Sequence, residues 1–438
     1  MPFPSSAVSD SVRSAPPSLW RNSDFRRLWL GQTASQLGEH TSLVIIPLIA
    51  VLTLHADASQ LGVLRAVGQA PILLLALFVG AWVDRWRTRT VMVLADLGRT
   101  VALGGAVVAV LYGFGLQAML VVAFTIGAMS VFFDVAYQAS LVRLVKRDQL
   151  VRGNSALEGS RSAAQIGGPA LGGALVSLLS APIAAASSAL IFALSCLSIR
   201  RIRRTESIPE RSERPSRVWR RIHEGLRFVV GDASLRAIGL ASAAFQFAFA
   251  AMMTVYLLFL PRELQLSGSA VGLALAAIGP GALVGSLLAA HLPSRLGHGL
   301  VLVSAAAIGD GVMLCVPALH GPSAVTILSL VAVNFVFGAF GQLVNVTHMA
   351  VRQAVTPDGM QGRVSATITF AGMGLTPLGS LLGGYLAEVW GLRTSLLVAA
   401  AGMMLSPVLM ALSPLVRLGR ELPALHEALP TVEHPRPT

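Results

Sequence analysis

Long apolar runs separated by short polar connections dominate the sequence. A helix that crosses a bilayer needs roughly 20 mostly apolar residues. No stretch shows the period-two alternation of a membrane β-strand, so a β-barrel is not predicted. The pattern therefore predicts an all-α integral membrane protein with twelve spans, at residues 28–54, 59–83, 91–112, 117–137, 155–179, 182–199, 236–260, 268–292, 299–318, 323–350, 364–387 and 393–415.

Composition supports this fold class. Hydrophobic residues make up 54% of the chain and charged residues only 12%, whereas soluble domains carry about 25% charged residues. Residues 1–24 and 417–438 are polar, and we expect both to be disordered tails. The first of them lacks the apolar run of a signal peptide. Cys196 and Cys315 lie inside spans and are expected to be small apolar core residues rather than metal ligands.

Basic residues gather on one side of the predicted membrane. The predicted outside connections hold only Arg262 and Arg393, whereas the connection 200–235 alone holds ten arginines. This distribution predicts that both termini of the multi-pass protein lie in the cytoplasm, and we expect the membrane to be the plasma membrane. The net charge of +12 does not indicate nucleic-acid binding, because no binding motif or interleaved aromatic residues accompany it. Residues 217–230 are typical of an amphipathic helix on the inner membrane surface.

The second half of the chain echoes the first at a constant offset of 210 in the numbering. The offset is the same from the first span to the fifth, and six spans per half give both halves the same topology. We therefore expect two parallel six-helix repeats, with a substrate site between them near the bilayer midplane. The matching pairs are Arg26 and Arg236, Gln36 and Gln246, Arg85 and Arg295, Val91 and Val301, Val93 and Val303, and Asp148 and Asp358.

The polar stretch GAWVDRWRTR at 80–89 interrupts the apolar pattern. It resembles the signature loop of the major facilitator superfamily, Gly-x-Leu-Ala-Asp-Arg-x-Gly-Arg-Arg/Lys. The matching residues are Gly80, Asp84, Arg85 and Arg89, whereas Arg87 and Thr88 depart from the pattern. The resemblance implies six-helix bundles at 25–199 and 236–416 that are joined by the cytoplasmic linker 200–235.

The same resemblance implies a conformational latch at this loop. Asp84 and Arg85 are expected to clamp the two halves together in the outward-open state, since Arg can pair with several carboxylates. Charges in membrane spans are costly and normally find partners. We expect further charges to join the latch, or to form purely structural pairs at i,i+3 spacing: Asp96 with Arg99, Glu158 with Arg161, and Asp134.

The first span carries polar residues on one helical face: Gln32, Gln36, Glu39 and His40. Glu39 lies about twelve residues from the cytoplasmic end, near the middle of the membrane. An ionisable group at that depth indicates a functional site. The resemblance to drug:proton antiporters, which carry an acid at a similar place, implies a proton-coupling role. Binding of substrate without proton movement is the alternative.

The resemblance also assigns cavity-lining roles in the second half. The first, fourth, seventh and tenth helices line the cavity in this superfamily, which places the polar residues of the later two spans there. Asp310, in the ninth span, is expected at the periphery and ranks below Glu39. The residues expected in the cavity are Gln246, Asn334, Gln342, Asn345 and His348.

The fifth span contains GGPALGG at 167–173, which resembles the end of the antiporter motif of exporters. Its matching residues are Gly168, Pro169, Gly172 and Gly173, and Ala164 stands where the motif has an upstream glycine. Proline weakens a helix, and small residues let helices approach closely. We expect a pivot or seal at the interface between the repeats, with ordinary close packing as the alternative.

Together these motifs resemble the multidrug or macrolide-type efflux branch of the superfamily. The resemblance implies export of small amphiphilic or hydrophobic molecules by alternating access, coupled to proton influx. No arginine lies between residues 117 and 137, where many proton-coupled relatives carry one. An importer or a proton-independent facilitator is therefore an alternative, and a non-transporting membrane scaffold or sensor is another.

The expected partners are a small-molecule substrate, protons and the lipid bilayer, and we expect a monomer. The sequence shows no nucleophile–base set, phosphate loop or metal cluster, so an enzyme is not predicted. No cofactor, ATP or nucleic acid is expected to bind.

Overall fold

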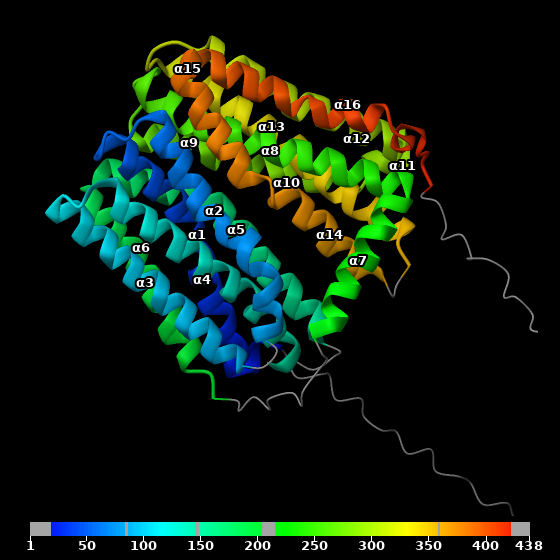
Figure 1. Cartoon of the computed structure of the whole chain (residues 1–438), viewed down its shortest axis with the longest axis horizontal. Coiled ribbons are helices and arrows are strands. Elements are labelled where there is room, and N and C mark those ends of the chain that lie inside the picture. The colour runs from blue at the N-terminus through cyan, green and yellow to red at the C-terminus, as the bar shows by residue number, and fades with distance from the viewer. Residues whose placement is uncertain (1–18, 84–85, 145–148, 204–214, 358–359, 422–438) are drawn as a thin grey trace, which may run out of the picture.

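The computed structural model describes residues 19–83, 86–144, 149–203, 215–357 and 360–421, and these ranges are helical with no β-strand (Figure 1). Much of both predicted tails and of the linker lies outside the described residues. The first half contains η1 (Leu19–Arg21), α1 (Ser23–Leu52), α2 (Ala58–Val83), α3 (Thr88–Tyr112), α4 (Gly115–Leu144), α5 (Leu150–Leu178) and α6 (Ala181–Arg200). After α7 (Pro215–Gly231), the second half contains α8 (Ala233–Arg262), α9 (Gly268–Ala276), α10 (Ile278–Ala289), α11 (Leu292–Leu296), α12 (His298–Val312), η3 (Met313–Ala318), α13 (Ala324–Val355), α14 (Gln361–Met373), α15 (Thr376–Met403), α16 (Leu405–Ala411) and η5 (Pro414–Arg417).

These helices account for the twelve predicted spans. Four spans in the second half are each built from two consecutive pieces, and α15 turns from one crossing into the next at Gly391, where φ is 78°. Ten segments of the described chain are long and apolar enough to cross a membrane, and the last of them, Gln361–Ala411, covers two crossings. The crossing outside these ten is α5, which carries Glu158 and Arg161.

The structure confirms the parallel repeat in the turns that link the first two crossings of each half. His55 and Gln265, which are related by the offset of the repeat, both adopt left-handed backbone, with φ of 53° and 54°. The Ala56 amide donates to the Ala50 carbonyl (2.8 Å), and at the equivalent positions of the second half the Leu266 amide donates to the Leu260 carbonyl (3.1 Å).

Two glycine seams join the halves. A Cβ at Gly62 of α2 would lie 3.0 Å from the Gly384 Cα of α15, and one at Gly173 of α5 would lie 2.5 Å from the Gly272 Cα of α9. Gly62 and Gly272 are again separated by the offset of the repeat, so the two seams are equivalent. Glycine is required because a side chain would strike backbone at this distance.

We call the end of the bundle that carries Leu19 and Leu418 the terminal face, and the other end the opposite face. One apolar core spans both halves toward the opposite face and includes Ile49, Leu61, Leu258 and Phe259. Toward the terminal face, the core residues of each half cluster separately. The two halves are therefore joined at the opposite face, and Figure 1 shows them diverging from there.

The amphipathic helix predicted at 217–230 is observed as α7. It packs against α8 and α14, and Gly225 allows this approach, because a Cβ there would lie 2.8 Å from the Thr367 Oγ1 and 3.0 Å from the Arg363 carbonyl. The segment that links the halves is thus attached to the second half at the terminal face.

Candidate functional site

Arg99 is the centre of a polar network inside the first half. Its side chain is fully buried, and it reaches two acids, with Nη1 3.4 Å from Asp96 Oδ1 and Nη2 3.8 Å from Glu39 Oε2. The guanidinium also lies over the rings of Phe133 (4.9 Å) and Phe192 (5.1 Å). Such cation–π contacts help to hold a charge that has left water.

Two serines complete the surroundings of Asp96. The Ser35 hydroxyl donates to Asp96 Oδ1 (2.9 Å) and accepts from Arg99 Nη1 (2.8 Å). The Ser195 Oγ lies 2.5 Å from Asp96 Oδ2 and 2.7 Å from the Gly31 carbonyl. A buried charge is tolerated when it is both paired and hydrogen-bonded, and this pair meets both conditions.

The carboxylate of Glu39 has fewer hydrogen-bond partners than the carboxylate of Asp96. Its Oε2 is buried and has no hydrogen-bond partner among the described residues, and its contact with Arg99 is long. Asp134 of α4 lies within electrostatic range of Glu39 and Arg99 and accepts from Gln36 Nε2 (3.4 Å). Arg99 thus contacts two carboxylates, and Asp134 and the partly exposed Arg161 lie within electrostatic range of this group.

The polar face predicted for the first span contacts several helices. Gln32 is buried and accepts from the Ser160 hydroxyl of α5 (3.1 Å). His40 also faces α5, where a Cβ at Gly168 would lie 2.5 Å from the His40 Cβ. The structure thus brings Gln36 and Glu39 to the Arg99 network, whereas Gln32 and His40 lie at the contact with α5.

The predicted latch residues are separated in the structure. Asp84 and Arg85 lie outside the described residues, Gly80 lies in the last turn of α2, and Arg89 lies in the first turn of α3. Asp96 and Arg99 lie deeper, the latter about 17 Å along α3 from its start. Glu158 and Arg161 form the predicted i,i+3 pair at 3.7 Å, but both are nearly half exposed.

The second half contains a partly open cavity of about 320 Å³, and the exposed Asn345 and Met349 are among the residues that line it. Gln246, Asn345 and His348 line it, although it lies within one half and not between the repeats, where the sequence predicted the substrate site. Asp310 lines it as well, with 5% of its surface exposed. The helix that carries Asp310 is expected at the periphery, but the side chain itself is buried and faces residues of α8 and α13.

Two other residues expected in the cavity are not among those that line it. Asn334 is buried, and its Nδ2 lies 2.7 Å from the Tyr256 hydroxyl and 2.8 Å from the Leu330 carbonyl. Gln342 packs beside Gly285 of α10. Both therefore serve contacts between helices of the second half.

The glycine motif of α5 faces two helices at once. Gly168 and Gly172 face α1, where a Cβ at Gly172 would lie 2.8 Å from the Thr41 carbonyl. Gly173 faces Gly272 of the other half, and a Cβ at Gly272 would lie 3.0 Å from the Pro169 carbonyl. The motif thus places α5 at the junction of the halves.

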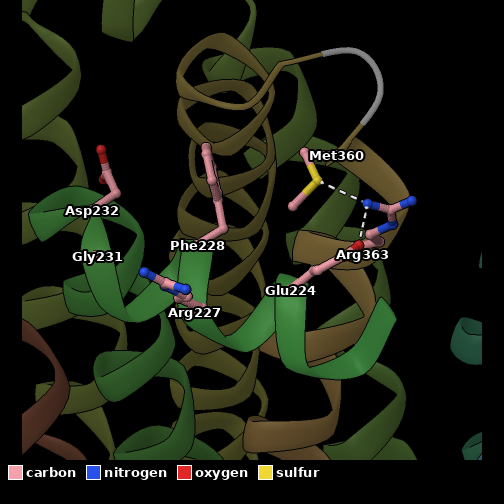
Figure 2. Close-up of a pocket in the computed structure, with 7 residues that line it drawn as sticks. All are labelled: Glu224, Arg227, Phe228, Gly231, Asp232, Met360 and Arg363. Carbon is pink, nitrogen blue, oxygen red and sulfur yellow. Dashed lines mark hydrogen bonds and ion pairs between the residues drawn. The ribbon is translucent and has the colours of Figure 1, made fainter. Parts of the chain in front are cut away.

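A larger hollow of about 600 Å³ lies on the surface between α7 and the start of α14. Figure 2 shows Arg363 between Glu224 and Met360 at one side of this hollow, with Arg227 further along α7 and Asp232 just after its end. Its charged residues are balanced in sign, and the Arg363 Nη1 to Glu224 Oε2 distance is 2.8 Å. We therefore interpret it as the docking contact of α7 rather than as a cargo site.

Sequence reasoning missed several residues of these sites. Ser35 and Ser195 carry no signal of their own, because serine is common in membrane helices. Arg65 of α2 did carry a signal, since it is an arginine inside a predicted span, and its Nε is buried without a partner. Among the described residues, no three His, Cys, Asp or Glu side chains are grouped to hold a metal.

Comparison with known proteins places this architecture in a family. A family model described as transmembrane secretion effector matches residues 14–433. A multidrug efflux pump, Tap, of Mycobacterium tuberculosis is 30% identical over 388 residues, which cover 83% of this chain and 87% of the relative. The Tap pump of Mycolicibacterium fortuitum is 26% identical over 390 residues, covering 87% and 93%.

Solved structures agree on the fold. A bacterial homologue of the iron transporter ferroportin, in an inward-facing state, has a TM-score of 0.71 at 16% identity and covers 90% of this chain and 98% of its own. A bacterial homologue of the lysosomal transporter Spinster, also inward-facing, has a TM-score of 0.69 at 14% identity, covering 92% and 98%. The chain therefore belongs to the transmembrane secretion effector family of the major facilitator superfamily, and it is a multi-pass membrane transporter rather than an enzyme.

Proposed function

We propose that the protein is a secondary active exporter of small amphiphilic or hydrophobic molecules in the plasma membrane, driven by proton influx. The observation that carries this proposal is the excess of acids in one group, where the carboxylates of Asp96, Glu39 and Asp134 share the buried Arg99 and the partly exposed Arg161. Burying net negative charge is costly, so such a group favours binding a proton. The Tap relatives, which are named multidrug efflux pumps, support the direction of transport.

Glu39 is the carboxylate best suited to exchange that proton. Asp96 is held by Ser35, Ser195 and Arg99, whereas Glu39 has an unpartnered oxygen and remains 21% exposed. Protonation of Glu39 would release its contact with Arg99, and loss of the proton would restore it. One proton that moves inward supplies about 2.3 kcal/mol per 100 mV of membrane potential.

The separation of the two cores at one face supports alternating access. With the termini in the cytoplasm, as the arginine distribution predicts, the terminal face is the cytoplasmic one. The halves are joined at the opposite face, so the structure corresponds to an inward-facing state. Rocking of the halves about the glycine seams would then expose the interior to the outside.

The proposal is tested in proteoliposomes that contain a trapped pH dye and a preset proton gradient. Lipophilic dyes and macrolides are added to the wild type, to Glu39→Gln and to the control Glu388→Gln, whose acid is exposed on α15. We expect transported compounds to collapse the gradient in the wild type and the control, and not in Glu39→Gln. Compounds that cross without proton movement would overturn the coupling and favour a facilitator.

A further inference from the structure

Asp310 is an acid without a partner in the interior of the second half. It lies about 18 Å along α12 from the start of that helix, and only 5% of its surface is exposed. No hydrogen bond or ion pair to its carboxylate is found among the residues that the structure describes. A charged side chain at such a depth is costly and is normally paired, so the missing counter-charge calls for a ligand.

The cavity beside Asp310 is separate from the Arg99 network. All residues that line it lie between Ile238 and Met410, so the first half contributes none. Its volume of about 320 Å³ is at the lower end of the roughly 300–1,000 Å³ of ligand pockets. The cavity is therefore suited to a small organic molecule.

The other lining groups indicate the chemistry of that molecule. Phe245 offers an aromatic ring, and Met349 and Met373 offer polarisable thioethers, which suit cationic and apolar groups. Gln246 and Asn345 add amide groups. The carboxylate at the deep end favours a positive charge there.

Two basic side chains also face the cavity, and both come from α13. His348 and Arg352 lie about 6 Å apart along the helix, and Arg352 is nearer the terminal face. The positive charge of Arg352 opposes entry of a cation, whereas the carboxylate of Asp310 favours it. Arg352 and Asp310 therefore make opposite contributions to the binding of a cation, and these contributions can be measured separately.

We propose that this cavity binds small organic cations, with Asp310 as the counter-ion of an ammonium group. The ligand class rests on the proposed efflux of amphiphilic molecules, but binding requires neither transport nor proton coupling. Benzyltrimethylammonium is a suitable probe because its charge does not depend on pH. Its neutral carbon analogue, neopentylbenzene, has the same shape without the charge.

The test is equilibrium binding of radiolabelled benzyltrimethylammonium to the purified full chain in detergent. We expect Asp310→Asn to weaken binding at least about tenfold, because it removes the charge partner. Asp310→Glu should restore part of the affinity, and Arg352→Gln should increase it. Neopentylbenzene should not displace the cation, and the control Glu388→Gln should bind like the wild type.

A second variant tests the site without altering charge. A side chain at Gly341 would enter open space, since no atom lies within 4 Å of its Cβ position, and Gly341 lines the cavity. We expect Gly341→Leu to abolish binding, whereas Gly362→Leu, which also enters open space but lies outside the cavity, should not. Wild-type affinity in both Asp310→Asn and Gly341→Leu would overturn the proposal.

Two further results would also overturn it. Equal binding of the neutral analogue would show that charge plays no part. Loss of binding in Glu39→Gln, with binding kept in Asp310→Asn, would place the cation in the first half. A protein that fails to couple protons in proteoliposomes but binds the cation through Asp310 would contradict only the proposed coupling.

Discussion

At the scale of single residues, burial distinguishes two ion pairs of identical spacing. Asp96 and Arg99 are both fully buried, whereas Glu158 and Arg161 are 49% and 43% exposed. Removing one partner of a buried pair leaves an unpaired charge in the interior, which costs about 3–5 kcal/mol. Exposed pairs contribute about 0–1 kcal/mol.

We therefore expect Asp96→Ala to destabilise the protein strongly and Glu158→Ala to change its stability little. The measurement is the melting temperature of the detergent-purified variants, which fluorescence-detected size-exclusion chromatography monitors. Ser195→Ala should fall between them, since it removes one hydrogen bond to a charged group, which contributes about 1.5–3 kcal/mol. Equal melting temperatures for Asp96→Ala and Glu158→Ala would contradict this account of the network.

Sequence patterns revealed the individual charges but not all of their partners. The i,i+3 spacing predicted the two ion pairs, because helix geometry fixes which neighbours meet. It did not predict that Ser195, 99 residues beyond Asp96, would contact the same carboxylate, because that contact depends on how α3 packs against α6. Asn334 shows the same limit, since its partner Tyr256 lies on another helix.

At the scale of helices, close packing of glycine against glycine determines where the halves meet. Gly173 and Gly167 lie on the same helix, but only a Cβ at Gly173 would strike the backbone of α9, at 2.5 Å from the Gly268 carbonyl oxygen. The GPALGG pattern predicted tight packing in α5. It did not predict the seam of Gly62 with Gly384, because a pattern of small residues does not indicate which helix packs against it.

We expect Gly173→Ala to reduce transport at least tenfold, because the added methyl group prevents closure of the opposite face. Gly167→Ala, where no atom lies within 4 Å of the Cβ position, should transport normally. Alanine is also favoured over glycine in a helix by about 1 kcal/mol, so Gly167→Ala should not be less stable. Initial rates of dye efflux check this expectation, and equal rates for the two variants would contradict it.

The amphipathic helix α7 gives a second test at this scale. Glu224 lies 2.8 Å from Arg363 of α14 and 3.4 Å from Arg220 of α7 itself. We expect Glu224→Arg to speed hydrogen exchange of the α7 amides up to about fivefold, since partly exposed pairs contribute no more than about 1 kcal/mol. The charge reversal Glu224→Arg/Arg363→Glu should restore slow exchange. Faster exchange in the double variant than in the single one would show that α7 docks by other contacts.

At the scale of the whole molecule, the repeat determines the fold and underlies the proposed rocking motion. The constant offset between the halves predicted the topology from a few matching residues, and it reappears in the left-handed residues His55 and Gln265 and in the two seams. The conformational state was not predictable, because the same helices pack into inward-facing and outward-facing arrangements. The shared core shows which end of the bundle is joined in this structure, and the state follows from it only with the proposed orientation.

Spin labels at positions related by the repeat test the rocking motion. Trp86 and Leu296 are exposed near the terminal face, and Asp57 and Ser267 are exposed at the opposite face. When cargo is added in the presence of a proton gradient, the distance between labels at Trp86 and Leu296 should shorten. The distance between labels at Asp57 and Ser267 should lengthen. The two distances are measured by double electron–electron resonance. If both change in the same direction, rocking about the seams is ruled out.

The central claim is that cargo and protons compete through the acids around Arg99. The most direct measurement is proton release when cargo binds to the purified protein in weakly buffered detergent solution. We predict release of about one proton per bound molecule in the wild type and in Glu388→Gln, and none in Glu39→Gln. Cargo binding without proton release in the wild type, or equal release from Glu39→Gln, would contradict the account.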